Sequence, residues 1–140
     1  MRRHAAAGST SIEFAVTAVA LLMMILGVIE GGLLYWTWQA LEAAVIDAAR
    51  CAAINASSCQ NVATAPAGTR TYAAGAALAR GLSGVSAGDV TVTTGTGAQT
   101  GCGTSGTNFV SVAISYQFGL DFLVVPPTSV SASACFPLAG

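Results

Sequence analysis

A glycine and a glutamate near the N-terminus are the first residues whose spacing suggests chemistry. Gly8 ends a short basic leader, and Glu13 stands five residues later, just before an apolar run over residues 15–29. A carboxylate is costly in a helix that is otherwise compatible with lipid, so Glu13 requires a partner. If the chain is cut after Gly8, Ser9 becomes a new α-amino terminus and Glu13 becomes its fifth residue. The amine of a neighbouring copy could then neutralise Glu13 in a membrane or a fibre.

No other group of residues favours catalysis. Residues 84–88 match G-x-S-x-G, but a nucleophile elbow needs a strand before it and a helix after it, and the expected order is the reverse. The only histidine, His4, lies in the leader and lysine is absent, so the usual bases that activate a serine are missing. The carboxylates are scattered, and the cysteines lack C-x-x-C spacing. We therefore expect no enzyme, no metal and no cofactor.

The composition excludes a disordered chain and is unusual for a soluble globule. Hydrophobic residues make up 54% of it and charged residues only 8%, whereas a soluble domain carries about 25% charged residues. The formal net charge of −1 becomes −3 when the two leader arginines, Arg2 and Arg3, are removed. Because no basic patch exists, nucleic acid is not an expected partner, and no small-molecule substrate is identifiable.

One segment can span a bilayer. Residues 14–36 exceed the roughly 20 apolar residues that a spanning helix needs. The leader arginines precede this segment and the next basic residue is Arg50, so the positive-inside rule places the N-terminus in the cytoplasm. An aromatic belt at the outer interface consists of Tyr35, Trp36 and Trp38. A twin-arginine signal and a cleaved secretory signal are the alternatives. The first needs more than a bare Arg-Arg pair, and the second needs a short apolar core followed directly by a small-residue cleavage site.

Three residues inside the span could mediate helix packing. Gly27 and Gly31 form a G-x-x-x-G match, which lets two helices approach closely. Glu30 lies between them, where a carboxylate costs free energy. In one interpretation, Glu30 reaches the outer surface or is protonated. In the other, it contacts another subunit of a fibre or of the machinery that assembles it. The sequence leaves both interpretations open.

Helical periodicity continues beyond the membrane. Apolar residues recur at three- and four-residue steps at Leu41, Ala44, Val45, Ala48 and Ala52. Asp47 and Arg50 have the i,i+3 spacing of a helical ion pair. The pattern predicts one continuous helix from about Ile12 to Ile54, with a small domain packed on the Leu41/Val45/Ala48 stripe.

The remainder predicts a short helix followed by strands. Thr69 or Thr71 can cap a helix that runs to about Arg80, with Leu78 and Leu82 on one side and Gly81 as its stop. Strands are expected at residues 89–94, 109–118 and 130–136, a long exposed loop at 95–108, and a loop or short strand at 122–127. The expected inward residues are Val110, Val112, Ile114, Tyr116, Phe118, Val130, Ala132, Ala134 and Phe136. The fold class is therefore α+β, with about three antiparallel strands.

Four cysteines follow the membrane segment, as expected for two disulfides in an oxidising compartment. Three pairings are possible. We favour Cys51–Cys59, which would clip a loop to the helix end, with Cys102–Cys135, which would pin the glycine-rich loop to the last strand. Four free buried thiols in a cytosolic protein are the alternative.

The N-terminal third resembles a known family. A cut after glycine with glutamate at mature position five resembles the processing site of type IV pilin-like proteins. Residues 11–16 (SIEFAV), 26–31 (LGVIEG), 39–44 (QALEAA) and 48–50 (AAR) are similar to the TadE-like minor pilins of tight-adherence (Tad/Flp) pili. The resemblance is specific over about residues 8–55 and covers the rest only in the order of its elements. Ser9 departs from the phenylalanine found there in many type IV pilins.

The resemblance implies a minor pilin or pseudopilin that is not an enzyme. A prepilin peptidase would cut the leader, residues 1–8, between Gly8 and Ser9, and Glu13 and Phe14 would serve recognition and assembly. Residues 9–38 would be transmembrane and residues 39–140 extracytoplasmic. The protein would lie in the bacterial inner membrane and join the pilus at the cell surface.

The implied partners are prepilin peptidase, other pilins, pilus assembly proteins and inner-membrane lipid. The protein would prime, cap or sparsely join a fibre used in surface adhesion. The main alternative is an uncleaved single-pass envelope protein with a ligand-binding outer domain. Within the same system, a TadF-like role and a major pilin are further alternatives, although major pilins of such pili are much shorter.

Overall fold

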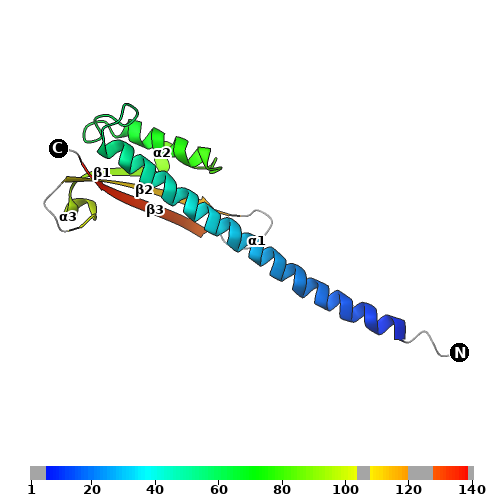
Figure 1. The fold of residues 1–140 in the computed structure, drawn as a ribbon. Coiled ribbons are helices and arrows are strands. Elements are labelled where there is room, and N and C mark those ends of the chain that lie inside the picture. Colours follow the sequence, from blue (N-terminus) through cyan, green and yellow to red (C-terminus); the bar gives the residue numbers. More distant parts are fainter. Residues whose placement is uncertain (1–5, 104–107, 120–127, 139–140) are drawn as a thin grey trace. The chain divides into compact units, whose positions relative to one another are not determined.

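The computed structural model describes residues 6–103, 108–119 and 128–138. Contacts divide the chain into two compact units, Met1–Tyr35 and Trp36–Gly140. The elements, in order, are helix α1 (Ala6–Ala53), helix α2 (Ala67–Ala79), the 3-10 helix η1 (Ala87–Asp89), strand β1 (Val90–Thr96), helix α3 (Gly97–Thr100), strand β2 (Asn108–Phe118) and strand β3 (Thr128–Pro137) (Figure 1). The fold class is α+β, as expected.

Helix α1 contributes to both units. It begins at Ala6 instead of Ile12, because the alanines before Gly8 favour helix. It ends beside Asn55, which adopts a left-handed backbone conformation with φ of 51°. The N–H of Asn55 donates to the carbonyl of Ala52, and that of Ala56 donates to the carbonyl of Cys51. This is the Schellman motif, which satisfies carbonyls that the helix end leaves open.

The core of the second unit contains the predicted stripe of α1. Leu41, Val45 and Ala48 are fully buried, and so are Ala44 and Ala49. On β2 the side chains of Val110, Val112 and Ile114 are buried as well. The three-residue and four-residue spacing of apolar residues on α1 and the two-residue spacing on β2 therefore each bury one face, as predicted.

The sheet is antiparallel in the order β1-β2-β3 (Figure 1). Val112 of β2 lies opposite Val92 of β1 and Ala134 of β3. Toward the ends of β2 and β3 burial falls off: Tyr116, Phe118, Ala134 and Phe136 are only half-buried. The predicted loop or short strand at 122–127 lies outside the described residues.

The prediction for α2 was partly wrong. Neither threonine caps the helix: α2 begins directly after Pro66, and Thr71 lies inside it, where its hydroxyl donates to the carbonyl of Ala67. Proline at a helix start has a suitable φ and lacks only an N–H that would be unpaired there. The buried residues are small ones, Thr69, Ala73 and Ala77.

The two leucines expected on one side of the helix differ in burial, and the end of α2 explains the difference. Leu78 is 59% exposed, whereas Leu82 is buried. Gly81, with φ of +89°, stops the helix as predicted. The N–H of Leu82 then donates to the carbonyl of Ala77, so the Schellman turn directs Leu82 back toward the buried face.

The segment 95–108 is not one long exposed loop. β1 continues through Gly95 and Thr96, which lie opposite Phe109 and Asn108. The short helix α3 follows, with Gly97 buried. It is started by a capping box, in which the N–H of Thr96 donates to the side-chain oxygen of Gln99. Glycine and threonine content indicated a loop, but this local hydrogen bonding and the continued pairing with β2 outweigh it.

Candidate functional site

The residues of the predicted processing site lie at the start of α1. Gly8 and Ser9 belong to its first turn, where N–H groups have no partner four residues back in the helix. Such a turn can be opened at little cost in hydrogen bonds, as a protease that binds an extended backbone would require. Cleavage between these two residues stays a prediction.

Glu13 and Phe14 lie one turn further along and are exposed to the surroundings. Phe14 is 74% exposed. The hydroxyl of Thr17 donates to the carbonyl oxygens of Glu13 and Phe14, at 2.9 Å and 3.0 Å. Among the described residues none forms an ion pair with the Glu13 carboxylate.

Much of the apolar surface of α1 is exposed among the described residues. Fifteen large apolar side chains from Ile12 to Trp38 are exposed. The helix contains an 18-residue window of mean hydropathy 2.5 of which nothing is buried, so it is long and apolar enough to cross a membrane. The aromatic residues expected at the interface, Tyr35, Trp36 and Trp38, are exposed by 63%, 66% and 42%.

The two glycines of the G-x-x-x-G match leave open space beside the helix. A Cβ atom built on Gly27 or Gly31 would meet no atom within 4 Å. Because they are four residues apart, they lie on the same side of α1, where the backbone of another helix could approach. Glu30 is half-buried between them. A packing role for these three residues stays a prediction.

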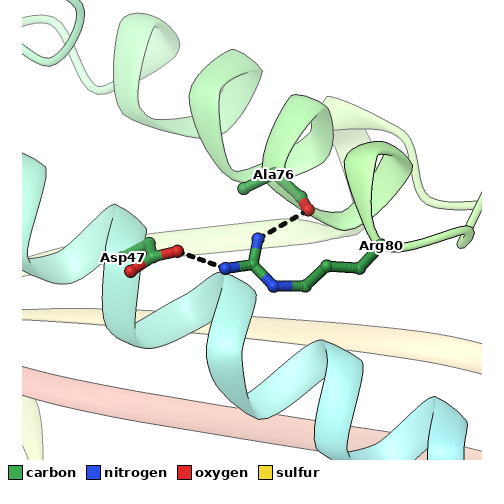
Figure 2. Close-up of polar contacts among 3 residues, drawn as sticks. All are labelled: Asp47, Ala76 and Arg80. Carbon is green, nitrogen blue, oxygen red and sulfur yellow. Dashed lines mark hydrogen bonds and ion pairs between the residues drawn. The ribbon is translucent and has the colours of Figure 1, made fainter.

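In the second unit an ion pair joins α1 to the end of α2. Arg80 reaches from the end of α2 to the Asp47 carboxylate on α1, and its other terminal nitrogen donates to the carbonyl of Ala76 at 2.8 Å (Figure 2). The sequence pairing of Asp47 with Arg50 was therefore wrong, because the ion pair forms between two helices and not along one. Both side chains remain partly exposed, so the pair contributes at most about 1 kcal/mol.

Two disulfides close the second unit, and every cysteine is paired. Cys51–Cys59 joins the last turn of α1 to the following loop, and Cys102–Cys135 joins the segment after α3 to β3. These are the pairs that the sequence favoured. The first is buried, with Cys59 fully enclosed, whereas Cys135 of the second is exposed.

The serine of the G-x-S-x-G match has a structural role. Ser86 precedes η1, and its hydroxyl and its backbone N–H both donate to the carboxylate of Asp89, at 2.7 Å and 2.9 Å. These two hydrogen bonds, that from the hydroxyl first, hold the pKa of the Asp89 carboxyl below its ordinary value. The element that follows is β1, so the strand-turn-helix context of a nucleophile is not present here.

Sequence reasoning did not predict these two capping boxes. Their signal was nonetheless available, since Ser86-x-x-Asp89 and Thr96-x-x-Gln99 both have the cap residue and its acceptor three positions apart. The Asp47–Arg80 pair carried no such signal, because the two residues are 33 positions apart in the chain.

An open hollow of about 380 Å³ lies at the C-terminal end of α1. Its lining consists of Asp47, Arg50, Cys51, Ile54, Ala56, Ser58 and Tyr72. One of its polar lining residues, Asp47, already pairs with Arg80.

Comparison with known proteins supports the resemblance of the N-terminal segment. Residues 8–50 match the family model of the TadE-like proteins. The match begins at Gly8, includes Glu13, Gly27, Glu30 and Gly31, and ends just before Cys51. No curated protein and no solved structure matches the chain. The resemblance to TadE-like proteins is thus confirmed over this segment, which suggests a Tad pilus-associated protein with a structural role.

Proposed function

We propose that the chain is a minor pilin or pseudopilin of a Tad/Flp-type pilus, processed by a prepilin peptidase between Gly8 and Ser9. The observation that carries the proposal is the combination of the TadE-like match over residues 8–50 with an exposed apolar surface on the part of α1 from Ile12 to Trp38. The match includes the proposed cut and the residue at mature position five.

The apolar surface requires a covering environment. Burying one large apolar side chain is worth about 1.5–3 kcal/mol, so fifteen of them exposed to water would be strongly unfavourable. Lipid can cover them before assembly, and the helices of other pilins can cover them in a fibre. The leader arginines favour a cytoplasmic N-terminus in the inner membrane, with the disulfide-bonded unit on the oxidising side.

Glu13 would set the contact between neighbouring subunits. After the cut, Ser9 carries a free α-amino group, and the Glu13 carboxylate of an adjacent copy or pilin can pair with it. A carboxylate in a low-dielectric environment needs a cationic partner. The α-ammonium group of Ser9 exists only after the cut, so an uncut chain would leave Glu13 unpaired. The open sides of Gly27 and Gly31 would let the two helices come close enough, and the outer unit would offer contacts for priming, capping or adhesion.

The experiment compares Glu13→Ala with Glu42→Ala, a matched change of a second glutamate on α1. We expect both variants to insert in the membrane, while Glu13→Ala alone lowers the amount of the protein in isolated pili and the number of pili per cell. Unchanged piliation with Glu13→Ala would remove the assembly role of this residue.

A second variant tests the cut itself. We expect Gly8→Ala to accumulate as a full-length precursor in membranes, because a side chain at this position hinders close approach of the backbone to the peptidase. Normal processing of Gly8→Ala would refute the assigned cleavage site, whatever the outcome for Glu13.

A further inference from the structure

The two edges of the sheet differ in how they are covered. β1, at one edge, contacts both α2 and α3. β3, at the other edge, pairs with β2 alone among the described strands. An edge strand has N–H and C=O groups on its outer side that no strand of its own sheet can pair, and these can pair with another strand.

β3 lacks the features that usually protect such an edge. From Thr128 to Phe136 it contains no charged residue and no proline, and Pro137 comes only at its end. All its residues are paired with β2 in continuous register, so the strand is held extended. The disulfide from Cys102 to Cys135 further fixes its C-terminal part. The edge is therefore preorganised to receive a strand.

The sequence of β3 indicates which strand fits. If two copies of β3 pair antiparallel about Ala132, Ser131 lies opposite Ser133 and Val130 lies opposite Ala134. Serine thus meets serine on the exposed face, and apolar residues meet on the face where Val130 and Ala132 are buried. No like charges face each other, and the small side chains let the two backbones come to hydrogen-bonding distance.

We propose that two copies of this chain associate through their β3 strands, forming a six-stranded sheet across a two-fold axis at Ala132. The nine residues 128–136 pair in both directions, and Pro137, which has no N–H, lies just outside the paired segment. The pairing uses only residues of the unit Trp36–Gly140, so it does not depend on whether the leader is cut. It would add to a pilin role a mode of association through the outer unit.

The test uses charge pairs on the exposed face of β3 in the full-length protein in detergent. In Ser131→Lys/Ser133→Lys, each lysine lies opposite another lysine of the partner, whereas in Ser131→Lys/Ser133→Glu each lysine lies opposite a glutamate. The two variants carry changes at the same two exposed positions, so the second controls for folding and for any association through α1. Sedimentation over a range of concentrations measures the dimerisation constant.

We expect the wild type to dimerise and the Lys/Lys variant to dimerise at least about tenfold more weakly. The Lys/Glu variant should recover a dimerisation constant close to that of the wild type. Hydrogen exchange gives a second readout, since the outward amide groups of β3 become protected only in the dimer. Three results would overturn the proposal: a wild type that stays monomeric in its outer unit, with freely exchanging β3 amides; equal association of all three proteins; and a Lys/Glu variant as weak as Lys/Lys.

Discussion

Single residues in this chain act mainly through short local hydrogen bonds. Ser86 and Asp89 illustrate this, because a serine inside a motif that elsewhere carries a nucleophile is used to start a 3-10 turn before β1. Its hydroxyl and N–H stabilise the ionised form of the Asp89 carboxyl.

This assignment predicts a change in one pKa. In Ser86→Ala the largest stabilising hydrogen bond is removed, so the pKa of Asp89 should rise toward its ordinary value, measured by an NMR titration of the Asp89 carboxyl carbon. Ser83→Ala, in the same exposed loop, should leave that pKa unchanged. If the two variants titrate alike, the Ser86 hydroxyl is not the cause of the lowered pKa.

The same pair contributes a pH dependence whose direction is fixed. The pKa of Asp89 is lower in the folded than in the unfolded chain, so the unfolded state takes up the proton first. The contribution to stability is present above the unfolded pKa of about 3.9 and is lost as the pH falls through the lower, folded pKa. Ser86→Ala should therefore flatten the loss of stability in this acidic window.

At the scale of elements, the periodicity of apolar residues predicted which faces of α1 and β2 are buried. The α1 stripe at Leu41, Val45 and Ala48 and the β2 alternation at Val110, Val112 and Ile114 were predictable, because each buries one face against a partner. The exposed position of Leu78 was not predictable from spacing alone. Alanines of α2 fill the buried face, and the turn at Gly81 directs Leu82 toward that face.

The two disulfides should differ in their rate of reduction. A thiolate must reach a sulfur atom to reduce a disulfide, and Cys135 is exposed whereas Cys59 is fully buried. A mild reductant followed by alkylation and mass spectrometry should label Cys102 and Cys135 before Cys51 and Cys59. In denatured protein the difference should disappear, and equal rates in the folded protein would contradict the burial described here.

Reducing the second bridge should also cost more stability in a simple loop-closure model. Cys102–Cys135 spans 33 residues and Cys51–Cys59 spans 8, which corresponds to about 3.7 and about 2.5 kcal/mol of stabilisation. The bridge that is more open to reductant is thus the one that constrains the unfolded chain more strongly.

At the scale of the whole molecule, the sequence divides into a segment with a family match and a segment without one. Residues 8–50 carry the TadE-like match, the exposed apolar surface of α1 and Glu13. The three strands of the sheet and the four cysteines of the two disulfides lie after the matched segment. The resemblance to TadE-like proteins could be predicted from the N-terminal third, because glycine, glutamate and apolar residues occur there at the family's spacings.

What the second unit contacts could not be predicted from spacing, because it depends on which edge of the sheet remains open. β1 contacts α2, a separate helix, and α3, which directly follows it in the chain. The Asp47–Arg80 pair arises in the same way, from two helices that only the folded chain brings together. The open edge of β3 is accordingly a property of the assembled unit.

The measurement that tests the central claim most directly is the intact mass and N-terminal sequence of the protein isolated from its native membrane. Processing by a prepilin peptidase predicts a chain that starts at Ser9, with Glu13 as its fifth residue. A chain that starts at Met1 would contradict the proposal and would favour an uncleaved, single-pass envelope protein whose outer unit binds a ligand.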